Sequence, residues 1–93
     1  MTKILKGNQK FYIGEDEANP IAQLTYKEVD QDTIEADHTF VSETLRGQGI
    51  ANELFKEFMA FVEKENKKVI PTCSYVKLRM ERSKQYRPYI REE

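Results

Sequence analysis

The sequence predicts an α+β fold, an α/β sandwich whose elements follow the order β-β-β-α-β-α. Three short strand-like runs separated by turns precede residue 42, which indicates an antiparallel meander. From Ile50 onward the apolar residues recur at three- and four-residue spacing, which is typical of a helix packed on a sheet. One further apolar run and a second helical segment follow. We therefore expect a mostly antiparallel sheet with a central helix packed on it and a C-terminal helix.

The length and composition are those of one small globular domain covering residues 1–93. A chain of this size buries only roughly 60–65% of its unfolded surface, so the core is thin. With one cysteine and one histidine, neither an internal disulfide nor a structural zinc site is expected. The first residues lack the apolar run of a signal peptide, and no stretch is long enough to span a membrane. We expect a soluble cytoplasmic protein that is a monomer or a weak dimer.

The strands are bounded by turn residues. Residues 8–14 form the first strand, 21–26 the second and 33–41 the third, with turns at 15–20 and 30–32. In the third strand, strict alternation would place four side chains on one face: Ile34, Ala36, His38 and Phe40.

The two helices and the strand between them follow from spacing and capping residues. The first helix begins near Ile50 and ends near Asn66, which tolerates the left-handed cap conformation. Residues 69–73 form a fourth strand, parallel to the third because a helix joins them. Pro71 donates no ladder hydrogen bond, so this strand is an edge strand or splays from its neighbour at Pro71. Ser74 is a candidate N-cap for the second helix.

The junction between the third strand and the first helix carries the clearest functional signal. Residues 46–51 read Arg-Gly-Gln-Gly-Ile-Ala, a glycine-containing turn at a helix start, where unpaired amides and the helix dipole favour an anion. A dinucleotide-binding loop would need a third glycine at position 52, which is Asn52, and a Walker loop would need Gly-Lys-Ser/Thr. The loop therefore suits a diphosphate of another kind.

This Arg-x-x-Gly-x-Ala pattern at a β–α junction resembles the GNAT superfamily of acetyl-CoA-dependent N-acyltransferases, in particular its very small, minimal domains. The resemblance covers nearly the whole chain. The pieces that carry it are Asn8 with Phe11, His38-Thr39-Phe40-Val41, Arg46-Gly47-Gln48-Gly49-Ile50-Ala51 and Pro71-Thr72-Cys73-Ser74-Tyr75-Val76.

The resemblance implies a site for acetyl-CoA or free coenzyme A. The pantetheine arm would lie along Phe40 and Val41, and the pyrophosphate would contact the loop formed by Arg46, Gly47, Gln48, Gly49, Ile50 and Ala51. The thioester would then reach the gap between the third and fourth strands, close to Cys73. An amine of unknown identity, on a small molecule or a protein, would accept the acetyl group.

Two residues are candidate catalytic groups. In the minimal domains a cysteine at the position of Cys73 is a suspected catalytic residue, either acylated transiently or only lining the thioester. His38 is the only imidazole and is a candidate general base, although a histidine satisfied at the sheet edge is an equally good interpretation. Tyr75, Tyr86 and Tyr89 are candidate acids for the leaving thiolate, or else pack over the core.

Charge is unevenly placed along the chain. Residues 1–45 carry a net charge of −5 and residues 46–93 a net charge of +4, and residues 77–91 hold six bases against one acid. This basic stretch could face a phosphorylated cofactor, an acidic protein or nucleic acid, or be only a solvated face. The balanced total charge of −1 argues against nucleic acid. The alternative to an enzyme is a CoA-binding, CoA-sensing or partner-binding module with little catalysis.

Overall fold

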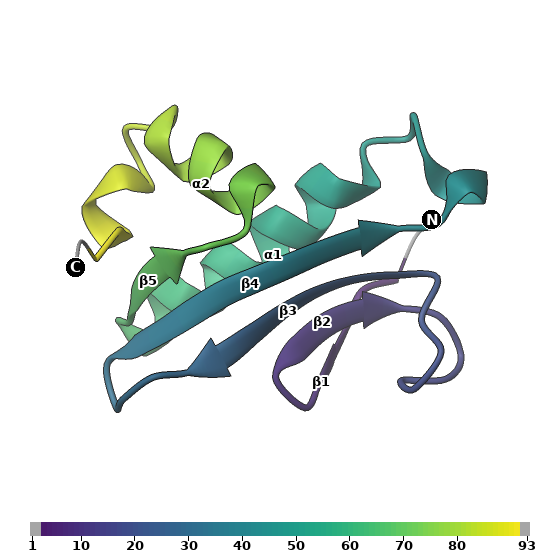
Figure 1. Cartoon of the computed structure of the whole chain (residues 1–93), viewed down its shortest axis with the longest axis horizontal. Coiled ribbons are helices and arrows are strands. Elements are labelled where there is room, and N and C mark those ends of the chain that lie inside the picture. The colour runs from purple at the N-terminus through teal and green to yellow at the C-terminus, as the bar shows by residue number, and fades with distance from the viewer. Residues whose placement is uncertain (1–2, 92–93) are drawn as a thin grey trace.

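The computed structural model describes residues 3–91 and has one five-stranded sheet with two helices (Figure 1). The strand order is β1-β2-β3-β4-β5. Neighbouring strands are antiparallel through β4, and β5 is parallel to β4. The elements are β1 (Leu5–Gly7), β2 (Lys10–Ile13), β3 (Ala22–Glu28), β4 (Thr33–Val41), α1 (Ile50–Glu65), β5 (Lys68–Pro71) and α2 (Ser74–Glu81), with short 3-10 turns at Glu43–Leu45 and Arg87–Tyr89. The α+β fold predicted from the sequence is confirmed.

Strand β1 was not predicted from the sequence. It pairs with β2 through a two-residue turn at Asn8 and Gln9, because Gly7 lies opposite Lys10. Gln9 adopts a positive φ of 58°. The usual signal for such a turn is Asn-Gly or Asp-Gly, which is absent here. A three-residue edge strand with an atypical turn leaves too weak a pattern to detect.

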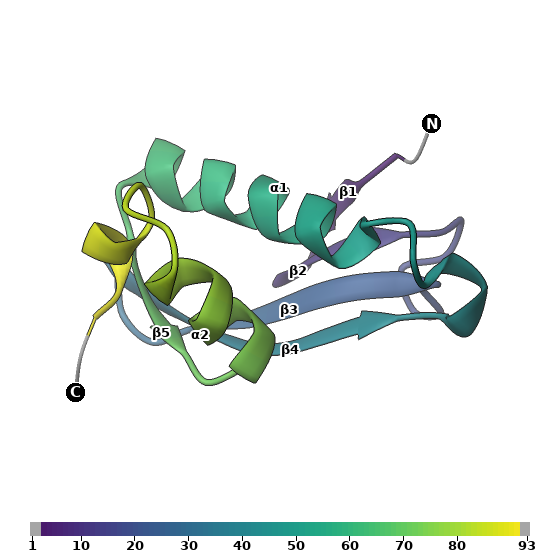
Figure 2. The same ribbon diagram turned by 90° about the horizontal axis from the view of Figure 1, so that it is seen from above.

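Helix α1 covers one face of the sheet and supplies much of the core (Figure 2). Six of its residues are buried at helical spacing: Ile50, Leu54, Phe55, Phe58, Met59 and Val62. The ring of Phe58 packs against Phe11 of β2 and Tyr26 of β3, at centroid distances of 6.3 and 5.8 Å. The helix ends at Asn66 in the left-handed conformation, as the sequence predicted. Burying these apolar side chains fixes α1 over the strands.

A β-bulge in β4 changes which side chains face the helix. Thr25 pairs with His38 and Tyr26 pairs with Ala36, so Asp37 is an extra residue. Ile34 and Ala36 are buried, as the alternation predicted. The same alternation was wrong for His38 and Phe40, which are exposed. Thr39 and Val41 take their place, opposite the buried residues Leu24 and Ala22 of β3.

Strand β5 is a parallel edge strand beside β4, as expected, and ends at Pro71. The amides of Thr72 and Cys73 both donate to the carbonyl of Ala36, and the chain then turns away from the sheet into α2. The expected capping by Ser74 is wrong: the N-cap is Cys73, without a side-chain hydrogen bond to the helix.

Helix α2 lies beside α1 near the β5 edge (Figure 2). Its buried residues are Val76 and Met80. The ring of Phe55 on α1 meets Tyr75 and Tyr86 edge-on, at centroid distances of 6.5 and 5.4 Å. These contacts join α2 and the segment after it to the same core.

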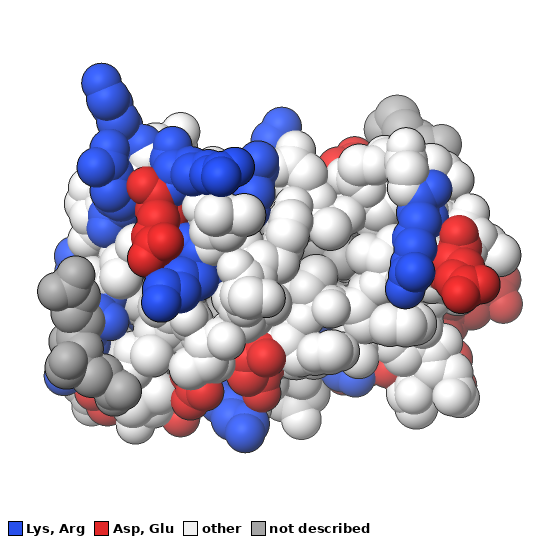
Figure 3. Space-filling model, turned by 45° about the horizontal axis from the view of Figure 1, so that its top comes forward, with Lys and Arg blue, Asp and Glu red and all other residues white. Residues whose placement is uncertain are grey.

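The molecule measures 35 × 25 × 20 Å along its principal axes. Lysine and arginine side chains gather at the end that carries α2 and the C-terminal segment (Figure 3). None of the helices in residues 3–91 is long and apolar enough to cross a membrane.

Candidate functional site

The strands β4 and β5 separate halfway along β4. Their pairing ends where Ala36 meets Pro71, whereas β4 continues to Val41, and Figure 1 shows the two strands diverging. The amide of Ser42 donates to the carbonyl of Ile21, toward β3. Because successive residues of a strand direct their backbone groups to opposite edges, those of Thr39 and Val41 face the open side of β4. This exposed edge can pair with an extended ligand as an added strand would.

The loop between β4 and α1 has a conformation that only flexible residues adopt easily. Gly47 and Gly49 have φ angles of 85° and 73°, in the left-handed region. A Cβ atom at either position would meet no protein atom within 4 Å, so the backbone angle is what calls for glycine. Gly49 is the N-cap of α1 and provides no side-chain cap. The amides of the first turn therefore remain open to an outside acceptor.

A cavity of about 210 Å³ lies between this loop, the end of β4 and α2. It is lined by Val41, Leu45, Arg46, Gly47, Gly49, Ile50, Ala51, Asn52 and Tyr75. Six of the eight residues expected to contact the cofactor lie on it. Of the other two, Gln48 donates to the Thr44 carbonyl within the loop, and Phe40 is 40% exposed on the opposite face of β4.

Arg46 lies at the mouth of the cavity with its side chain exposed. Its Nε atom is 3.4 Å from the carbonyl oxygen of Val41. A guanidinium here adds positive charge to the open amides of α1, which together favour an anion.

Cys73 lies at the point where the chain leaves β5 for α2. Its Sγ atom is half-buried and lies 3.4 Å from Oγ1 of Thr39, across the gap between the strands. The backbone at Cys73 is held on both sides: its amide donates to Ala36 and its carbonyl accepts from Lys77. The thiol is thus in a fixed position next to the open edge of β4.

Tyr75 connects the cavity with the cysteine. Tyr75 lines the cavity. Burial raises the pKa of its phenol, the charge of Arg79 lowers that pKa, and Cys73 raises it. The hydroxyl therefore keeps its proton at neutral pH and is able to donate it.

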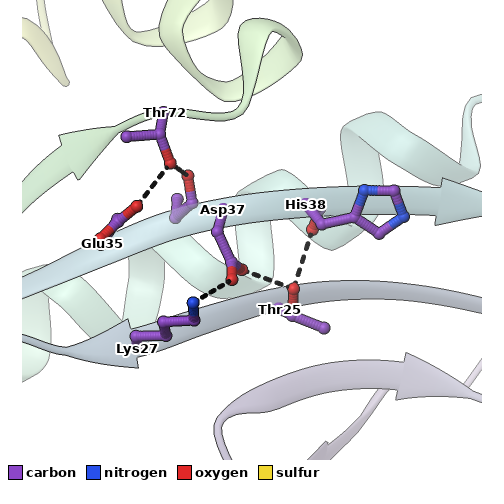
Figure 4. Close-up of polar contacts among 7 residues, drawn as sticks. Thr25, Lys27, Glu35, Asp37, His38 and Thr72 are labelled. Atoms are coloured by element: carbon purple, nitrogen blue, oxygen red, sulfur yellow. Dashed lines mark hydrogen bonds and ion pairs between the residues drawn. The ribbon is translucent and has the colours of Figure 1, made fainter.

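His38 is not brought to the cysteine. The bulge turns its side chain to the face of the sheet away from α1, where it is exposed (Figure 4). Its neighbours there form a separate polar group: Thr25 donates to Asp37 at 2.6 Å, Asp37 pairs with Lys27 at 3.7 Å, and Thr72 donates to Glu35 at 2.9 Å (Figure 4). The side chain of β4 that contacts the Cys73 thiol is that of Thr39.

The sequence did not predict three site residues: Leu45 and Asn52, which line the cavity, and Thr39, which contacts Cys73. Thr39 was placed on the wrong face because nothing in the sequence marks the bulge at Asp37. Asn52 lines the cavity and accepts a hydrogen bond from Arg79 of α2, a contact that depends on how the two helices pack.

A second and larger hollow lies away from these residues. Its volume is about 410 Å³ and its lining residues are Lys3, Ile4, Glu53, Lys56 and Glu57, between the N-terminal segment and the exposed side of α1. It contains none of the residues expected at the site. Within residues 3–91, no cluster of three or more His, Cys, Asp or Glu side chains is arranged to hold a metal ion.

Comparison with known proteins gives a family match over most of the chain. A family model described as GCN5-related N-acetyltransferase matches residues 10–89. The solution structure of a GCN5-like candidate N-acetyltransferase from Staphylococcus aureus superposes with a TM-score of 0.79 and 38% identity, over 99% of this chain and 90% of that one.

A structure of a GNAT family acetyltransferase from Elizabethkingia anophelis with acetyl-CoA bound has a TM-score of 0.56. It is 18% identical over 77% of this chain and 49% of its own, which shows a shared fold.

Two curated relatives are both described as Protein NATD1. The one from Xenopus tropicalis is 42% identical over 55 residues, and the one from Danio rerio is 37% identical over 71 residues. The matched segments span 59% and 76% of this chain, but only 50% and 64% of those relatives.

Proposed function

Because this chain belongs to the GCN5-related N-acetyltransferase family, we propose that it binds acetyl-CoA and transfers the acetyl group to an amine. The observation that carries this proposal is the cavity at the start of α1. It is lined on one side by the glycine-containing loop before α1 and on the other by Val41 and Tyr75. One ligand could therefore contact the loop with its pyrophosphate and extend toward Cys73.

In this arrangement the pyrophosphate accepts hydrogen bonds from the open amides at Gly49, Ile50 and Ala51, with Arg46 and Gly47 beside it. The pantetheine amides pair with the backbone groups of Thr39 and with the amide of Val41 on β4, whereas the Val41 carbonyl already accepts from Arg46. Gln48 contributes its backbone, because its side chain is bonded to Thr44. Phe40 contributes only by holding β4 in register, because its ring lies on the other face and its backbone groups point toward β3.

The reaction joins an amine to the thioester carbonyl. The amine nitrogen forms a bond to the carbonyl carbon, the carbon–sulfur bond breaks, and the CoA sulfur takes a proton. Tyr75, which lines the cavity, supplies that proton and is reprotonated from solvent, to which the amine releases its own proton. A backbone amide on the open edge of β4 stabilises the oxyanion. Cys73 either orients the thioester or accepts the acetyl group first, and both routes use the same position of Sγ.

Thermal unfolding with and without acetyl-CoA tests the proposal. At a ligand concentration of ten times Kd, binding stabilises the folded state by about 1.4 kcal/mol, which for a domain of this size raises Tm by roughly 7 °C. Arg46→Glu should remove most of the shift, and Lys64→Glu on the exposed side of α1 serves as its charge-matched control. An unchanged Tm at millimolar acetyl-CoA would exclude this cofactor.

Steady release of free CoA in the presence of amines then separates an enzyme from a module that only binds CoA. Turnover with any amine supports the transferase. CoA binding with no turnover across a panel of small amines and lysine peptides supports the sensing or partner-binding alternative.

A further inference from the structure

One end of the molecule carries a strongly basic surface next to the proposed site. Figure 3 shows lysine and arginine side chains gathered at this end. We call the exposed basic residues of α2 and the segment that follows the basic surface: Lys77, Arg79, Arg82, Lys84, Arg87 and Arg91. The only acid in the same stretch is Glu81. It begins four residues after Cys73, on the same helix that Cys73 caps.

Most of these cations are not neutralised by the described part of the chain. Arg91 pairs with Asp30 at 3.1 Å. Arg79 donates to the side-chain oxygen Oδ1 of Asn52, and its guanidinium lies over the ring of Phe55. Among residues 3–91, no hydrogen bond or ion pair engages the side chains of the remaining four, Lys77, Arg82, Lys84 and Arg87. Their charges are therefore available to an anionic partner.

The backbone under these side chains is fixed. Lys68 of β5 donates to the carbonyl of Pro88 at 2.7 Å and its ammonium lies over the ring of Tyr89. Ile90 bridges to Val69, and the amide of Arg91 donates to the same residue at 2.8 Å. A partner would therefore lose little free energy to ordering of the segment on binding.

The packing of the tyrosines argues against single-stranded nucleic acid. Such ligands bind basic grooves in which aromatic rings are open to stack on bases. Here Tyr75 and Tyr86 pack against Phe55, and Tyr89 lies under Lys68. The net charge of −5 on residues 1–45 would also repel a long polyanion. A short acidic peptide can follow the basic end without meeting the acidic one.

We propose that the basic surface docks an acidic segment of a protein, and that this segment presents the acceptor amine to the Cys73 end of α2. An eight-residue helix is about 12 Å long, so a peptide with its carboxylates near Arg82 and Arg87 can place a lysine a few residues away at the site. The acceptor role rests on the proposed acetyltransferase function, whereas the docking itself does not.

Binding of a labelled peptide tests this. The probe is a Glu- and Asp-rich peptide of about twelve residues with one lysine, long enough to span α2. The matched control peptide carries Gln and Asn in place of the acids. Fluorescence anisotropy at low salt is measured for the native chain, for Arg82→Glu with Arg87→Glu, and for the charge-matched control Lys56→Glu with Lys64→Glu on α1.

We expect the acidic peptide to bind the native chain, the Arg82/Arg87 variant to bind at least about fivefold more weakly, and the Lys56/Lys64 variant to stay within about twofold. The Arg82/Arg87 variant should keep its stabilisation by acetyl-CoA. Equal weakening of peptide binding in both variants would overturn the proposal. Tighter binding of single-stranded RNA of the same charge would also overturn it. So would loss of stabilisation by acetyl-CoA in the Arg82/Arg87 variant. Peptide binding without any acetyl-CoA binding would leave the docking surface standing and reject the transferase.

Discussion

At the scale of single residues, the contact between Thr39 and Cys73 defines the reactive end of the site. The hydroxyl and the thiol come from opposite sides of the gap between β4 and β5, 3.4 Å apart. A hydroxyl fixes the direction of the sulfur whether it donates to the sulfur or accepts from the thiol. The pair therefore holds Sγ in place beside the open backbone of β4.

Cys73→Ala should lower turnover by at least about tenfold while the Kd for acetyl-CoA changes less than twofold, because in the proposed complex the thiol lies at the thioester and not at the phosphates. Steady-state kinetics and calorimetry check the two quantities. His38→Gln is the control and should keep native turnover, since its side chain lies on the far face of the sheet. Equal loss of turnover and affinity in Cys73→Ala would point to a structural cysteine.

Thr39→Val removes the hydroxyl but keeps the shape of the side chain. Without the hydrogen bond to sulfur, the thiol loses a contact that fixes its direction, and turnover should fall by a few-fold. Steady-state kinetics measures this. Thr39→Ser restores the hydroxyl and should restore turnover. Native turnover in Thr39→Val would show that Thr39 does not act on the thiol.

At the scale of elements, the helices were easier to predict than the strands. Apolar residues at helical spacing and a left-handed cap at Asn66 predict helix α1, and both signals are local in the sequence. The bulge at Asp37 and the pairing of β1 depend on contacts with β3 and β2, which no local pattern encodes. This is why the loop of the candidate site could be predicted, whereas the face occupied by Thr39 and His38 could not.

The loop into α1 depends on Gly49. With φ at 73°, Gly49→Ala should destabilise the protein by about 1–2 kcal/mol, whereas Gly49→Asn should cost less because Asn tolerates this conformation. Urea unfolding measures both variants. No protein atom lies within 4 Å of the added Cβ, so a steric clash does not account for the loss. Equal stability of all three proteins would mean that the loop does not hold this angle.

Asp30 links the turn before β4 to the C-terminal segment. A hydrogen bond from the Asp32 amide, followed by the contact with Arg91, lowers its pKa below the usual 3.8. A carboxylate whose pKa is lowered by folding stabilises the fold above its unfolded pKa and loses that contribution as pH falls through the folded value. The native chain should therefore exceed Asp30→Asn in stability at pH 7, and the difference should shrink below about pH 3.8. Urea midpoints of both proteins, measured at pH 7 and below the pKa of Asp30, check this prediction. A stability difference that is the same at low and neutral pH would contradict it.

At the scale of the whole molecule, the three proposed functions lie along one side of the sheet. The loop at the start of α1 offers amides for phosphate, the divergence of β4 and β5 opens backbone groups and brings in Cys73, and α2 continues into the basic surface. A thin core serves all three, because Phe55 of α1 packs against both Tyr75 at the cavity and Tyr86 under the C-terminal segment. A ligand in the cavity should therefore affect the packing of Tyr86 and the C-terminal segment through Phe55.

The most direct test of the central claim is an NMR titration of the ¹⁵N-labelled chain with acetyl-CoA. The largest amide shifts should fall in residues 47–51 and 39–41, with smaller ones at Cys73 and Tyr75, and they should saturate together with one Kd. Shifts confined to residues 77–91, or no saturable shift at millimolar ligand, would contradict an acetyl-CoA site at the start of α1.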